Sequence, residues 1–143
     1  MPLLAQRSTL AFLGIRRGAA AASAQQTLVA VPSLPIQAVG KLKDRLQVDE
    51  ARAAELAGLA VRTYQRRKKE GAALSRSEAD ATLRTARVLE QAVATFGDEA
   101  RAIEWLKAPS AFLDGVPLDL IASDAGAQAV LDELGRIHWG DLA

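Results

Sequence analysis

The chain contains no cysteine, a single histidine, and aromatic side chains at only 4% of its 143 positions. Without cysteine it has no disulfide framework, no thiolate nucleophile and no cysteine-ligated zinc. One histidine cannot build a histidine-rich metal site, and no apolar run approaches the ~18 residues that cross a membrane. The glycines lack the spacing that cradles phosphates. The sequence therefore indicates a protein that is neither an enzyme nor membrane-embedded, works without cofactors and fits a cytoplasmic setting.

Apolar residues make up 50% of the chain, and many of them are alanines, which pack helices closely. They recur at three- and four-residue spacings, and no segment alternates as a strand does, so we expect an all-α protein. Charge is uneven: residues 1–40 carry +3, residues 41–76 carry +5 and residues 77–143 carry −7, which together give the net +1. A basic half and an acidic half indicate two different partners.

Residues 48–71, VDEARAAELAGLAVRTYQRRKKEG, have the pattern of a helix-turn-helix. The small Ala54 lies where two steeply crossing helices approach each other, and Gly58 supplies the freedom that the turn demands. The second helix, closed by Gly71, carries side chains that suit phosphates and base edges. The candidate DNA contacts are Arg62, Thr63, Gln65, Arg66, Arg67, Lys68 and Lys69.

A basic helix that merely faces water would show the same charges, so this alternative stays open. Ala60, at the cap of the second helix, also lacks the side-chain oxygen that usually bonds the free amides there. A preceding helix over residues 35–48, with Gly40 as an internal weak point, supplies the third element of the domain.

Residues 1–35 contain no acidic residue and are rich in alanine, serine and arginine. We expect a flexible basic arm with a short helix from about Leu3 to Ile15, and a DNA-binding domain over residues 36–74. The same composition fits an organellar transit peptide, a bacterial leader or upstream sequence from an early start codon. A basic arm also offers additional phosphate contacts.

The acidic half, residues 75–143, is marked by start and stop signals of helices. Ser75 and Glu78 have the form of a capping box, which starts a helix that ends near Phe96. The later signals are Gly97 as a stop, Asp98 as a cap, Pro109 as a stop, Pro117 in a first turn and Ser123 as the cap of a last helix to about Ile137. We expect Val130, Leu131, Leu134 and Ile137 to form the buried stripe of that helix, and Trp105 to lie in the core.

An ordered set of short motifs runs through this half. It comprises Phe96-Gly97-Asp98, Trp105-Leu106, Ala108-Pro109, Leu113, Pro117-Leu118-Asp119-Leu120, Gly126 and Leu134-Gly135-Arg136-Ile137 with Gly140. The set resembles the toxin-binding domain of the Xre/ParS-type antitoxins, and with the junction before it the resemblance covers roughly residues 40–143. Asp114 departs from the pattern, since the family commonly has glycine there.

The resemblance implies a small bacterial antitoxin that forms a homodimer or higher oligomer, binds the toxin encoded beside it and represses their shared promoter at operator DNA. The typical toxin has the RES fold and degrades NAD+, so the chain would inhibit an enzyme without being one. In the family the C-terminal segment covers the entrance to the toxin's active site. The positions that match are Arg136, His138, Trp139, Gly140, Asp141 and Leu142.

Trp139 supports a binding role from the residues alone, because a large aromatic near a chain end can anchor in a partner's pocket. A contact under the last helix would explain it equally well. A function of another class is also open: a stand-alone dimeric helix-turn-helix regulator whose acidic half only dimerises.

Overall fold

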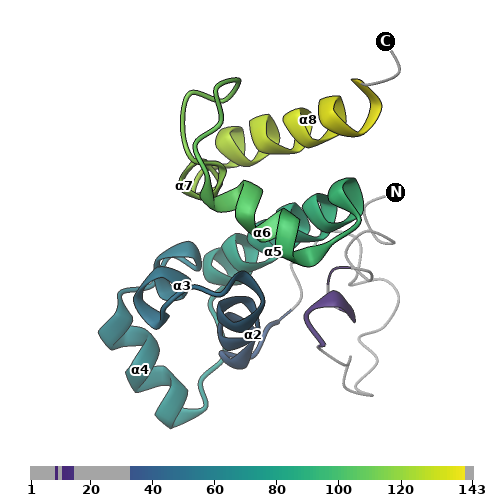
Figure 1. Ribbon diagram of the computed structural model, residues 1–143. Helices are drawn as coiled ribbons and strands as arrows, with labels where there is room; N and C mark the ends of the chain where they lie inside the picture. The colour runs from purple at the N-terminus through teal and green to yellow at the C-terminus, as the bar shows by residue number, and fades with distance from the viewer. Residues whose placement is uncertain (1–8, 10, 15–32, 141–143) are drawn as a thin grey trace, which may run out of the picture. The chain divides into compact units, whose positions relative to one another are not determined.

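The computed structural model describes Thr9, residues 11–14 and residues 33–140, and in these ranges it contains helices and no strand (Figure 1). The predicted all-α fold is therefore confirmed. The named helices are α2 (Gln37–Leu46), α3 (Glu50–Leu56), α4 (Val61–Glu70), α5 (Arg76–Phe96), α6 (Glu99–Lys107), α7 (Pro117–Leu120) and α8 (Asp124–Gly140). The described residues form two compact units, which divide between Leu83 and Arg84, inside α5.

The first unit is built on a buried cluster contributed by α2, α3, α4, the segments beside them and the start of α5. Its members are Leu34, Ile36, Ala38, Val39, Ala53, Ala54, Ala57, Leu59, Tyr64, Leu74, Ala79 and Leu83. Leu34 belongs to this core although it precedes the expected domain start, and its carbonyl oxygen accepts from the amide of Leu74 at 2.9 Å. This hydrogen bond connects the segment before α2 with the segment after α4.

The turn between α3 and α4 has the geometry that its sequence predicts. Gly58 has a φ of 78°, in the left-handed region that glycine adopts without strain. The amide of Leu59 donates to the carbonyl oxygen of Ala54 at 2.8 Å, and Ala54 is fully buried where α3 meets its neighbours. α4 starts after Ala60 without a side-chain cap, as expected, and ends at Gly71 with a φ of 69°.

Part of the N-terminal arm is packed. Thr9, Ala11 and Phe12 are helical, and the other residues of the expected Leu3–Ile15 helix, except Leu13 and Gly14, lie outside the described residues. The guanidinium of Arg45 on α2 lies 3.6 Å from the centroid of the Phe12 ring and donates to the Phe12 carbonyl oxygen at 2.7 Å. This short piece of the arm is thus attached to the first unit.

In the second unit, Asp98 caps α6 by accepting from the amide of Ala100 at 3.0 Å. A tight hairpin follows α6, in which the amide of Ser110 donates to the carbonyl oxygen of Gly115 at 2.8 Å. Asp114 in this hairpin has a φ of 53°, a conformation that favours glycine and tolerates aspartate. Asp114, where the family commonly has glycine, therefore occupies a position whose backbone is left-handed.

The last helix is longer than predicted, because α8 continues past Ile137 to Gly140. No helix breaker occurs between Ile137 and Gly140, so nothing in the sequence stops it there. Val130 and Leu134 are buried as expected, whereas Leu131 and Ile137 are only half-buried. None of the described helices is both long enough and apolar enough to span a membrane.

Candidate functional site

The outer face of α4 carries most of the side chains that were expected to contact DNA. Arg62, Gln65, Arg66, Lys68 and Lys69 are exposed, and Thr63 is half-buried. The face is held in place by Tyr64, which is buried in the core on the opposite side of the helix. Burial, together with the carboxylates of Glu50 and Asp44, raises the pKa of the Tyr64 hydroxyl, so the ring stays neutral under this basic face.

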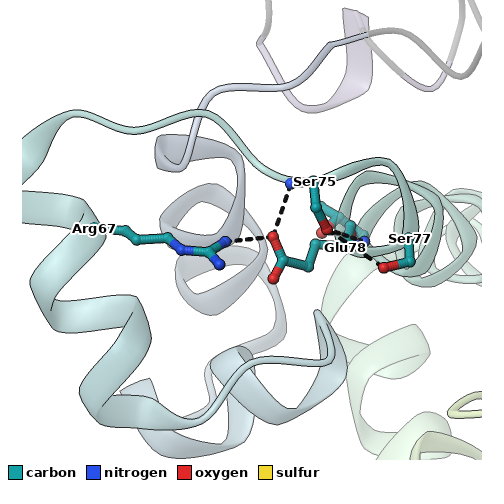
Figure 2. A network of polar contacts seen from close by, with 5 residues as sticks. Arg67, Ser75, Ser77 and Glu78 are labelled. Carbon is teal, nitrogen blue, oxygen red and sulfur yellow. Dashed lines mark hydrogen bonds and ion pairs between the residues drawn. The ribbon is translucent and has the colours of Figure 1, made fainter.

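Arg67 differs from the other basic residues of α4, because its guanidinium binds within the protein. Its Nη1 donates to Oε1 of Glu78 at 2.5 Å, and the amide of Ser75 donates to the same oxygen at 2.7 Å (Figure 2). The amide of Glu78 in turn donates to Oγ of Ser75 at 3.3 Å, which completes the predicted capping box. Arg67 therefore links α4 to the start of α5.

Glu78 is buried, with 8% of the residue exposed. Burial alone would raise its pKa, but the hydrogen bonds from Ser75 and the bond and charge of Arg67 together lower it below the ordinary value. Glu78, which the sequence predicts only as a capping residue, is thus also the partner of Arg67, one of the expected DNA contacts.

The expected toxin contacts lie along the last turns of α8. Trp139 is 67% exposed, and the His138 ring packs edge-on against it with 4.7 Å between ring centroids. Gly140 ends the helix, and Asp141 and Leu142 lie outside the described residues. The structure thus presents an exposed aromatic pair on an ordered helix.

Arg136, one turn before Trp139, is held by Glu133 through two hydrogen bonds. Its Nε donates to Oε2 of Glu133 at 2.9 Å and its Nη2 to Oε1 at 2.8 Å. The hydrogen bond and charge of Arg136 outweigh burial and lower the pKa of Glu133. The flat guanidinium also lies 4.1 Å from the ring centroid of Phe112, at the tip of the Ser110–Gly115 hairpin.

Phe112 and Arg84 are residues that the sequence patterns did not single out. Phe112 is 74% exposed, and its signal was an aromatic side chain in a short loop between Pro109 and Gly115. Trp105, expected in the core, is half-buried and packs on Phe96 with 5.7 Å between ring centroids. Among the residues that the structure describes, no three acidic or histidine side chains come together to hold a metal ion.

Two sequence families match this chain, and together they cover nearly all of its described residues. The antitoxin Xre-like helix-turn-helix domain matches residues 14–89, which is more than half of the chain. The chain belongs to the Xre antitoxin family. The C-terminal toxin-binding domain of the antitoxins Xre, MbcA and ParS matches residues 91–140.

A curated relative supports the same family. The protein named Antitoxin Xre from Photorhabdus laumondii subsp. laumondii is 30% identical over 109 residues, which span 75% of this chain and 74% of that protein. In the present chain, α4 lies in the helix-turn-helix domain. The Ser110–Gly115 hairpin and all of α8 lie in the toxin-binding domain. DNA and a toxin are therefore the two partners that its domains imply.

Proposed function

We propose that this antitoxin neutralises a RES-domain toxin that degrades NAD+, by covering the toxin's active site with the last turn of α8 and the residues that follow it. The observation that carries this proposal is the exposed His138–Trp139 pair at the end of an ordered helix. A large aromatic side chain that is exposed in the free protein can serve as an anchor in a partner's pocket.

Charge supports the same partner. Residues 77–143 carry −7, so the domain that binds the toxin is strongly acidic. A cleft that binds the pyrophosphate of NAD+ is expected to be basic, and opposite charges on two partners speed their encounter. The antitoxin acts here by binding, in the cytoplasm, and needs no catalytic group of its own.

We propose further that a homodimer or higher oligomer represses its own operon through α4. The exposed Arg62, Gln65 and Arg66 suit base edges and phosphates, and Lys68 and Lys69 suit phosphates. Two-fold symmetry would place two such helices on neighbouring half-sites of operator DNA, because one helix-turn-helix alone binds weakly.

Co-expression of the chain with the toxin encoded beside it tests the first proposal. Wild type should restore growth and keep cellular NAD+ constant, and Trp139→Ala should restore both less well. Gln91→Ala, an exposed and uncharged change on α5, should behave as wild type. Equal protection by Trp139→Ala would refute the role of the α8 end, and growth inhibition by the toxin without loss of NAD+ would refute the RES assignment.

A further inference from the structure

The two largest exposed apolar side chains among the described residues, Phe112 and Trp139, both lie in the toxin-binding domain. A large apolar side chain left in water is a common mark of a binding surface. Phe112 comes from the hairpin after α6 and Trp139 from α8, so two separate segments contribute. Arg136 connects them, since it lies over the Phe112 ring and one helical turn before Trp139.

The Phe112 ring is supported from beneath. The Ser110–Gly115 hydrogen bonds close the hairpin that carries it, and Asp114 makes the left-handed turn that the closure needs. The guanidinium of Arg136 stacks on the ring, and the two hydrogen bonds that it donates to Glu133 fix its plane. Such support lowers the entropy lost when the ring becomes buried in a partner.

We propose that Phe112 is a second anchor for the toxin, and that Arg136 is a positioning residue that holds Phe112 rather than a group that enters the toxin's active site. The proposal rests on the proposed function, because it takes the toxin as the occupant. The toxin is favoured because the family domain that binds it includes both the hairpin and α8. The toxin would offer an apolar pocket next to the surface that receives Trp139.

The test measures the dissociation constant of the full chain for the purified toxin encoded beside it, in a catalytically inactive form. Phe112→Ala should weaken binding about tenfold or more, as truncation of an aromatic anchor does. Phe112→Leu should retain part of the affinity, and the exposed, uncharged change Gln91→Ala should change nothing. The melting temperature of Phe112→Ala should equal that of wild type, since the ring is mostly exposed.

A double-mutant cycle separates positioning from direct contact. If Arg136 acts through Phe112, then Arg136→Ala weakens binding in the wild-type background and adds nothing in the Phe112→Ala background. Arg136→Lys, which keeps the charge but loses the flat stacking group, should weaken binding as Arg136→Ala does. Additive effects of the two changes would overturn the positioning role.

Wild-type affinity in Phe112→Ala would overturn the anchor while leaving the proposed function intact. A wild-type chain that does not bind this toxin at all would instead overturn both. Light scattering on the free chain tests whether Phe112 binds a second copy of this chain instead of the toxin. If Phe112→Ala dissociates the oligomer and leaves toxin affinity unchanged, the ring binds a second copy of this chain and the proposal is wrong.

Discussion

A methyl group placed on Gly126 would lie 1.8 Å from the carbonyl oxygen of Leu120. No non-bonded carbon and oxygen approach so closely, which means that only glycine fits where the start of α8 meets the end of α7. The same approach brings the amide of Gly126 to 3.0 Å from Oγ of Ser123, which caps the helix. The contact thus sets how α8, with its exposed end, leaves the α7 turn.

We expect Gly126→Ala to destabilise the toxin-binding domain by about 2–3 kcal/mol, because the overlap is with backbone and cannot be relieved by a rotamer change. Gly135→Ala on the same helix is the matched control. A methyl group there meets nothing within 4 Å, so the better helix propensity of alanine should stabilise by about 0.5–1 kcal/mol. Urea unfolding measures both, and equal effects of the two changes would contradict the proposed clash.

Arg84 on α5 holds the turn between α7 and α8 through backbone oxygens. Its Nε donates to the carbonyl oxygen of Ile121 and its Nη2 to that of Ala122, both at 3.1 Å, and its Nη1 pairs with the exposed Asp124. We expect Arg84→Met to destabilise by roughly 1–3 kcal/mol, since two carbonyl groups lose a charged donor. Asp124→Asn should cost less than about 0.5 kcal/mol, because an exposed ion pair contributes little. Thermal unfolding would reveal the difference, and a larger loss in Asp124→Asn would show that the ion pair dominates.

Local signals were predicted well because their physics is local. The turn at Gly58, the stop at Gly71 and the capping box of Ser75 and Glu78 depend only on neighbouring residues and their backbone angles. The stacking of Arg136 on Phe112 depends instead on how a hairpin and a helix pack together, which no short pattern encodes.

Arg67 shows the same limit within a correctly predicted element. Its position on α4 follows from the helical pattern, but its partner Glu78 lies on another helix, 11 positions along the chain. The helical pattern places every basic residue of α4, but it does not show that the Arg67 guanidinium is already bound to the Glu78 carboxylate.

The lowered pKa of Glu78 predicts a pH dependence of the first unit. A carboxyl whose pKa is lower in the folded than in the unfolded chain stabilises the fold above its ordinary value of 4.5, and this contribution disappears as the pH falls through the folded pKa. Glu78→Gln should therefore be less stable than wild type at neutral pH, and the difference should shrink towards about pH 3. Urea midpoints at the two pH values measure it, and a difference that does not change with pH would contradict the assignment. The pKa of Glu133 is also lowered, so the Glu78→Gln variant should still lose some stability as the pH falls.

The exposed and the engaged cations of α4 should behave differently on DNA. Each Lys or Arg that neutralises a phosphate contributes about 0.9 to the slope of log affinity against log salt concentration. We expect Arg66→Ala and Lys69→Ala each to lower the slope by about that amount on operator DNA. Arg67→Ala should leave the slope unchanged and lower the melting temperature, because its guanidinium binds Glu78.

Fluorescence anisotropy at several salt concentrations measures these slopes, with Arg101→Ala on α6 as a control for the loss of one exposed positive charge. If Arg67→Ala lowers the slope as much as Arg66→Ala does, Arg67 exchanges Glu78 for phosphate when DNA binds. If neither Arg66→Ala nor Lys69→Ala lowers it, α4 does not lie on the phosphate backbone, since a helix in contact with DNA cannot lose two phosphate contacts without changing the number of released ions.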